Sequence, residues 1–159
     1  MPLQVIEAAD PLTNLIHLKM SPIYEMMISL RALLHPSRRE SAWAVRAREA
    51  LGPDFWQELT EVYGPYAQGD LFLELAIDFP DDEDVEGYLA YVREMEPVRF
   101  VFYVIGRVLP VERLAETGLD PRKLDAALGR VENLCPWLCQ EDLTLEPILA
   151  DVPAFQARL

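Results

Sequence analysis

The chain has 159 residues, of which 51% are hydrophobic and 26% are charged, and it carries a formal net charge of −13 at pH 7. This length fits one domain, so we expect residues 1–159 to fold around a core of their own. The composition excludes disordered, collagen-like and disulfide-scaffold proteins. The charge argues against direct binding of this segment to nucleic acid, because nonspecific binding to a phosphate backbone depends on Lys and Arg.

The sequence also bears on the cellular compartment. It contains no run of 18 apolar residues, and its N-terminus lacks the basic region and apolar core of a signal peptide. Two cysteines are too few for a disulfide framework. These features predict a cytoplasmic protein that has no contact with the membrane.

The first twenty residues have strand-like stretches. Residues 3–7 and 15–20 are β-compatible, and the turn-prone residues 9–11 separate them. The pattern leaves open a small N-terminal β-hairpin in front of a protein that is otherwise predicted to be mainly α-helical.

The clearest helix is predicted to start at Ser21. Ser21 suits the N-cap and Pro22 the first helical position, and Pro36 ends the segment. Apolar residues recur between them at helical spacing. This stripe consists of Ile23, Met26, Met27, Leu30 and Leu34.

Two further helices are predicted on either side of Gly52, which supplies a left-handed stop for residues 38–51. Pro53 starts the next helix, and Gly64 ends it. The inner face predicted for the first helix is formed by Trp43, Ala47 and Ala50. The inner face predicted for the second is formed by Phe55, Leu59, Val62 and Tyr63. Short helices with short connections indicate a helical bundle.

Two apolar stretches suit either a helix or a strand. In residues 71–79, the i, i+4 spacing of Glu74 and Asp78 favours a helix. Residues 98–109 follow Pro97 and are apolar nearly all round, which predicts the central buried helix of the bundle. A strand remains an alternative for this stretch because β-branched and aromatic residues dominate it.

Aspartates are predicted to begin the remaining helices. The acidic run at residues 81–84 precedes an apolar stripe at helical spacing, where carboxylates favour the positive end of a helix dipole. Asp120 suits the N-cap of a helix that continues to Leu134, and Asp151 that of a helix over residues 152–159. The last helix runs to the final residue. This indicates either a chain cut from a longer polypeptide or a short C-terminal helix that docks on the core.

Cys135 and Cys139 are the candidate pair for redox or metal chemistry. Three residues separate them, whereas structural zinc and thioredoxin-like sites use two. The acidic run at residues 81–84 lacks the alternating ligands and central glycine of a calcium loop. We therefore predict buried structural thiols, no metal site and no cofactor.

No motif predicts catalysis. Phosphate-binding loops, dinucleotide fingerprints and zincin motifs are missing from the sequence. Glu25 and Ser29 share the polar side of one helix without a strained turn that would expose a nucleophile, so we do not combine them with His35 into a hydrolase site. We predict a protein that is not an enzyme. The alternative is a small standalone enzyme whose cleft contains scattered groups such as Glu25, Tyr103 and Arg107.

Aromatic and methionine side chains are candidates for an apolar ligand cavity, although core packing is their commoner use. The residues that we predict to line such a cavity are Met27, Trp43, Trp56, Phe100 and Tyr103.

The basic residues concentrate in the first third of the chain. Residues 1–53 hold six Lys and Arg against five Asp and Glu, while residues 54–159 hold eight against 22. The basic group can contact the acidic part of the same chain, or an acidic partner. It comprises Arg31, His35, Arg38, Arg39, Arg46 and Arg48.

The segment SPIYEMMISLRAL at residues 21–33, followed by His35-Pro36 and a Trp-containing helix, resembles the N-terminal region of a group of bacterial ArsR-like transcription regulators. In that group a helical domain precedes a winged helix-turn-helix. The resemblance implies a homodimeric, effector-sensing domain that binds an apolar small molecule, with DNA bound by a segment outside this one.

This chain departs from the group in two respects. Nothing in it resembles a winged helix, and the paired-cysteine motif of the metal-sensing members is missing, so metal sensing is not implied. A protein–protein adaptor without a ligand is a further alternative.

Overall fold

A computed structural model describes residues 21–64, 73–81, 83–129 and 145–159 of the chain. Within these ranges the chain forms α-helices and one short 3-10 helix, and no strand. The elements are α1 (Pro22–Leu34), α2 (Ser41–Leu51), α3 (Pro53–Tyr63), η2 (Leu73–Ala76), α4 (Val85–Glu94), α5 (Pro97–Val104), α6 (Val111–Thr117), α7 (Pro121–Leu128), α8 (Glu146–Ala150) and α9 (Val152–Arg158). The predicted helical bundle is confirmed, whereas the suggested N-terminal hairpin lies outside the described residues.

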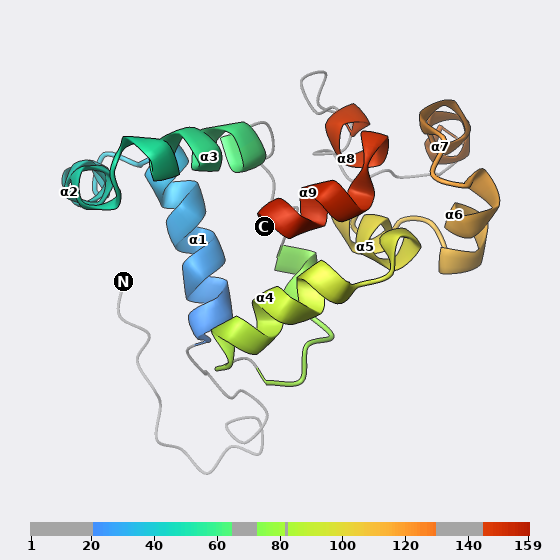
Figure 1. The fold of residues 1–159 in the computed structure, drawn as a ribbon, viewed down its shortest axis with the longest axis horizontal. Helices are drawn as coiled ribbons and strands as arrows, with labels where there is room; N and C mark the ends of the chain where they lie inside the picture. The colour runs from blue at the N-terminus through green and yellow to red at the C-terminus, as the bar shows by residue number, and fades with distance from the viewer. Residues whose placement is uncertain (1–20, 65–72, 82, 130–144) are drawn as a thin grey trace, which may run out of the picture.

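The helices form a linked arrangement around α4, α5 and α9 (Figure 1). Helices α1, α2 and α3 pack on one another, and α1 also contacts α4. Helix α9 contacts both α4 and α5, while α6 joins α5 to α7. Figure 1 shows that α9 brings the last residues of the chain towards α3 and α1. Segments from both ends of the described chain therefore lie close together.

Helix α1 begins and ends as predicted. The Ser21 Oγ accepts a hydrogen bond from the N–H of Tyr24 at 3.4 Å, and Pro22 occupies the first turn. At the other end the N–H of His35 donates to the carbonyl of Arg31. Ile23 from the predicted stripe is buried and its other members are partly buried, whereas Leu33, which the stripe did not include, is buried as well.

Helices α2 and α3 meet at Gly52, whose φ of +81° gives the positive-φ turn that was predicted there. The predicted inner face of α2 is wrong for Trp43 and Ala50 and right for Ala47, which is partly buried. Ala44 is the buried residue, whereas Trp43 is 39% exposed and Ala50 is exposed as well. The helix is rotated by about one residue from the predicted orientation.

Arg48 explains this orientation of α2. Its Nη2 donates a hydrogen bond to the backbone carbonyl of Leu33 at 2.7 Å, and its guanidinium lies 3.9 Å above the ring of Trp56. A cation over an aromatic face stabilises the contact electrostatically. One member of the basic group thus joins α2 to both α1 and α3, through a carbonyl and an aromatic ring and not through the acidic residues that were expected as its partners.

The helical alternative is confirmed for the stretch at residues 71–79 over η2, where Leu75 and Ala76 are buried. Residues 71 and 72 lie outside the described ranges. The described members of the acidic run are exposed, and Asp84 caps α4 as its Oδ1 accepts a hydrogen bond from the N–H of Gly87 at 2.8 Å. The predicted solvated helix start is confirmed for these residues.

Helix α5 is the buried helix that was predicted, and the strand alternative is wrong. Phe100 and Tyr103 are at most 1% exposed. The helix nevertheless ends at Val104 rather than near residue 109. Gly106 and Arg107 have φ of +66° and +57°, so the chain leaves the helix through two left-handed residues.

Helix α7 begins where it was predicted and ends earlier. The Asp120 Oδ1 accepts a hydrogen bond from the N–H of Lys123 at 3.0 Å, which confirms the cap. The helix ends at Leu128, before Gly129, and not at Leu134. Residues 130–144, including the cysteine pair, are outside the described ranges.

Helix α9 is capped by Asp151, as predicted, and is held on α4 by a buried amide. The Gln156 Nε2 donates hydrogen bonds to the carbonyls of Val92 and Met95 at 2.8 and 2.9 Å, and the side chain is 1% exposed. Buried polar groups are stable when they are hydrogen-bonded in this way. This contact fixes where the C-terminal helix lies.

The described helices enclose two apolar clusters. The larger one surrounds α5 and includes Phe100 and Leu114, both with no exposed surface. The smaller one lies between α1, α2 and α3 and contains Leu33, Ala44 and Leu59. None of the described helices is both long enough and apolar enough to cross a bilayer.

Candidate ligand-binding groove

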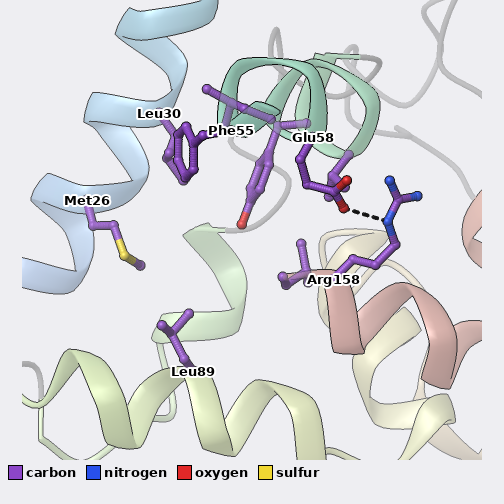
Figure 2. Close-up of a pocket in the computed structure, with 10 residues that line it drawn as sticks. Met26, Leu30, Phe55, Glu58, Leu89 and Arg158 are labelled. Carbon is purple, nitrogen blue, oxygen red and sulfur yellow. Dashed lines mark hydrogen bonds and ion pairs between the residues drawn. The ribbon is translucent and has the colours of Figure 1, made fainter. Parts of the chain in front are cut away.

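An open apolar groove of about 270 Å³ lies where α1, α3, α4 and α9 meet. Its volume lies just below the range typical of small-molecule sites, roughly 300–1,000 Å³. Figure 2 shows Met26 and Leu30 projecting from α1, Leu89 from α4 and Arg158 from α9. The complete lining is Met26, Leu30, Phe55, Glu58, Leu59, Val62, Tyr63, Leu89, Arg158 and Leu159.

Helix α3 supplies half of this lining because its apolar residues recur at helical spacing. Leu59 and Val62 are buried, whereas Phe55 at the start of the helix is 44% exposed. A large aromatic ring left this open gains free energy when an apolar group covers it, at about 25 cal/mol per Å² removed from water. The groove is therefore suited to holding an apolar molecule.

The polar groups of the groove lie at its rim. The Arg158 Nε contacts the Glu58 Oε1 at 2.8 Å, shown as a dashed line in Figure 2, and the Arg158 Nη2 contacts the Glu61 Oε2 at 3.1 Å. The hydrogen bond from Arg158 lowers the pKa of Glu58. Exposed ion pairs contribute little to stability, because water and salt screen their charges. These two pairs therefore hold α9 against α3 weakly.

Tyr63 contributes the remaining polar group of the lining. Burial raises its pKa to about 12, partly offset by the positive charge of Arg93. The phenol is therefore protonated at neutral pH. It cannot act there as a base.

A second, smaller hollow adjoins the groove and shares Met26, Tyr63, Leu89 and Leu159 with it. Its volume is about 10 Å³, which is roughly the minimum that a single water molecule needs. Met27 lines this hollow. Methionine side chains adapt readily to ligand shape, so the two methionines of α1 give this wall some plasticity.

The five residues predicted for an apolar cavity are not brought together in one site. Phe100 and Tyr103 are buried in the larger core cluster, Trp43 lies on the exposed side of α2, and Trp56 packs against the smaller cluster. Only Met27 reaches the neighbourhood of the groove, through the smaller hollow.

The groove combines residues that the sequence pattern placed on separate helices. Met26, Phe55, Tyr63 and Leu89 were among the apolar residues at helical spacing, but Arg158 and Leu159 carried no such signal. Because these two lie at the end of α9, their proximity to the other lining residues depends on how α9 docks. The prediction relied on aromatic side chains, and it therefore selected core residues instead of groove residues.

The residues proposed for the alternative enzyme hypothesis also lie apart from the groove. Arg107 pairs with Glu74 of η2 at 3.1 Å, and Tyr103 donates a hydrogen bond to Asp78. Burial and the bond to Asp78 raise the pKa of Tyr103, which favours the neutral phenol. These pairs join α5 and the turn that follows it to η2 and the residues that follow it, while Glu25 is exposed in the first turn of α1.

The part of the chain that the structure describes contains no group of three or more His, Cys, Asp and Glu side chains that could hold a metal ion.

Comparisons with known proteins give no match: no family model, curated protein or solved structure matches this chain.

Proposed function

We propose that this chain is a non-catalytic, effector-sensing domain that binds an apolar small molecule in the groove between α1, α3, α4 and α9. The observation that carries the proposal is the groove itself, an open apolar site built from four helices. Each methylene that it removes from water would contribute about 0.8 kcal/mol to binding. Association and ordering offset part of this gain.

The position of the groove supports a sensing role. Its walls come from helices far apart in the sequence, and α9 is held over it by two exposed ion pairs and one buried amide. A ligand changes a conformational equilibrium only through different affinities for the two conformations. A ligand would meet this condition if it contacts α9 in one position of this helix and loses the contact in another.

The wider setting of the proposal is a cytoplasmic transcription regulator similar to the ArsR-like group. DNA would be bound by a segment outside this one, because the net charge of −13 disfavours contact with phosphates. Sequencing the gene beyond the codon for Leu159 tests this setting. We expect a continuing frame with a helix-turn-helix and a basic recognition helix. A stop codon there would contradict it.

Self-association is part of the same proposal, and two large apolar side chains exposed on one side of α2 support it: Trp43 and Leu51, which are eight residues apart. Exposed apolar surface of this kind favours a protein interface. Sedimentation equilibrium should show a homodimer that the double variant Trp43→Glu, Leu51→Glu converts to a monomer. A wild-type protein that is monomeric at all concentrations would contradict the dimer.

The binding proposal is tested with N-phenyl-1-naphthylamine, an uncharged fluorophore that brightens in apolar sites. We expect saturable binding to the wild type, and at least tenfold weaker binding to Leu30→Trp and to Leu89→Trp, each of which fills the groove from a different helix. Val111→Trp is the matched control, because Val111 is exposed on α6 and does not line the groove. Circular dichroism checks that every variant is folded.

The outcome is decided by comparing the four proteins. Binding that the control retains within twofold and both groove variants lose supports the proposal. Absence of saturable binding to the wild type, or equal binding by all folded variants, would contradict it.

A further inference from the structure

The solvent side of α1 carries an exposed apolar side chain at its centre. Ile28 is the middle residue of α1 and is 52% exposed, while the buried Ile23 and Leu33 lie on the opposite side of the helix. Tyr24 and Ala32, four positions before and after Ile28, line up with it in one row and are partly exposed. This row forms a ridge on α1, with Ile28 as its most exposed point.

The ridge is complementary to itself when two copies of α1 pack antiparallel. About a two-fold axis at Ile28, residues that lie the same number of positions before and after it face each other. Tyr24 of each copy then meets Ala32 of the other, so a bulky side chain packs against a small one. Large side chains packed against small ones fill an interface without voids.

The charges beside the ridge follow the same symmetry. Glu25 and Arg31 lie three positions before and after Ile28, and both are exposed. An antiparallel pair therefore brings Glu25 of each copy level with Arg31 of the other, twice in one interface. Glu25 forms no ion pair within the described part of the chain. Arg31 acts on Glu40 of its own copy, and the several N–H donors of a guanidinium allow it to contact a second carboxylate.

The two ends of α1 lie in surroundings of opposite charge. Figure 1 shows the start of α4 beside the first turns of α1, and the two helices contact each other. Residues 81–87, which lead into α4, hold five acidic and no basic residues, whereas residues 31–46 hold four arginines against one glutamate. Antiparallel packing places the acidic end of each copy at the basic end of the other, an arrangement that electrostatic complementarity favours.

We infer that a second copy of this chain docks on the exposed side of α1, antiparallel to it, with Ile28 at the two-fold axis and Glu25 beside Arg31 of the other copy. The inference rests on the proposed self-association and adds a contact through α1 to the one through α2. The apolar ridge provides the affinity. The charges select the orientation, because a parallel pair would place like charges level with each other.

The centre of the surface is tested with Ile28→Arg, which places two positive charges together at the axis. Sedimentation equilibrium should show a dimer at least tenfold weaker than that of the wild type. Val111→Arg is the matched control, because Val111 is also an exposed apolar residue but lies on α6. It should retain the wild-type affinity within twofold. Circular dichroism checks that both variants are folded.

The orientation is tested by charge reversal. Glu25→Arg and Arg31→Glu, each alone, place like charges at both symmetric contacts, and each should weaken the dimer by about tenfold. An equal mixture of the two variants has opposite charges at both contacts, so the mixed dimer should form with the wild-type affinity. The double variant Glu25→Arg, Arg31→Glu keeps the net charge, exchanges the partners and should also dimerise as the wild type does.

The outcomes separate this inference from the proposed self-association. If the wild type is dimeric but Ile28→Arg retains its affinity, or if the mixture associates no more tightly than either charge variant alone, the contact through α1 is overturned while self-association through α2 stands. If the wild type is monomeric at all concentrations, the proposed self-association falls, and the inference falls with it.

Discussion

The docking of α9, which closes one side of the groove, depends on the buried amide of Gln156. We expect Gln156→Met to destabilise the protein, because methionine has a similar size but no N–H groups. Two hydrogen bonds disappear, those to the carbonyls of Val92 and Met95 at 2.8 and 2.9 Å. Since the side chain is 1% exposed, water cannot readily replace them.

The size of the effect follows from the two carbonyls. A buried polar group without its hydrogen bond costs about 1–3 kcal/mol, and a hydrogen bond lost from a group that keeps another partner costs about 1 kcal/mol. The carbonyl of Val92 still accepts a hydrogen bond from the N–H of Met95, so the variant is expected to lose about 2–4 kcal/mol of unfolding free energy. Because native domains are stable by only about 5–15 kcal/mol, this is a large fraction. The similar volume of methionine keeps the contribution of a cavity small.

Urea unfolding followed by circular dichroism measures this change. The midpoint of Gln156→Met should fall by roughly 1–2 M relative to the wild type. The matched control is Gln57→Met, since Gln57 is exposed and bonds only to Glu61 on the surface of α3. It should change stability by less than about 0.5 kcal/mol. A loss that small for Gln156→Met would refute the role given to this amide.

Three further predictions concern the core, a cap and the rim. Phe100→Ala should destabilise the protein by about 3–5 kcal/mol in the same assay, because Phe100 has no exposed surface; a loss below about 1 kcal/mol would contradict the central place of α5. Asp84→Ala should cost about 1 kcal/mol, because the cap of α4 is lost, whereas Asp81→Ala should cost less; equal losses would contradict the cap. Glu58 has a pKa below its ordinary value of 4.5, so its stabilising contribution is present above about pH 4.5 and is lost as pH falls through the lower folded pKa. Thermal unfolding of Glu58→Gln should accordingly depend less on pH in this acidic range than that of Glu116→Gln, and identical profiles would contradict the ion pair.

The helix starts were predictable because their signals are local. Ser21, Asp84, Asp120 and Asp151 each cap a helix with their own side-chain oxygen. Such a bond forms within three residues of the cap and needs no tertiary contact. The apolar spacing that followed the caps then identified the buried side of α1 and α4.

The errors arose where tertiary contacts or the backbone conformation determine which side of a helix is buried or where the helix ends. Ala44 rather than Trp43 faces inwards because Arg48 bonds to Leu33 and stacks on Trp56, a contact between three helices. Helix α5 ends early because Gly106 and Arg107 turn left-handed. Neither cause leaves a periodic signal in the sequence.

The groove was the least predictable feature. Its lining comes from four helices, and α9 reaches it through a buried glutamine and an exposed arginine that no apolar pattern identifies. The sequence predicted that an apolar site would use aromatic side chains, but the most buried of these, Phe100 and Tyr103, serve the core. Partial exposure distinguishes the groove aromatic Phe55 from the core aromatics Phe100 and Tyr103, and it depends on the fold.

The most direct test of the proposed binding site is a titration of the protein, labelled with ¹³C at the methionine methyl groups, with N-phenyl-1-naphthylamine. Met26 lines the groove, whereas Met95 is buried in the larger core cluster and is not part of the lining. We predict that the Met26 methyl signal shifts saturably with added ligand while the Met95 signal stays in place. A saturable shift of Met95 without one of Met26, or no saturable shift of either, would contradict the groove as the binding site.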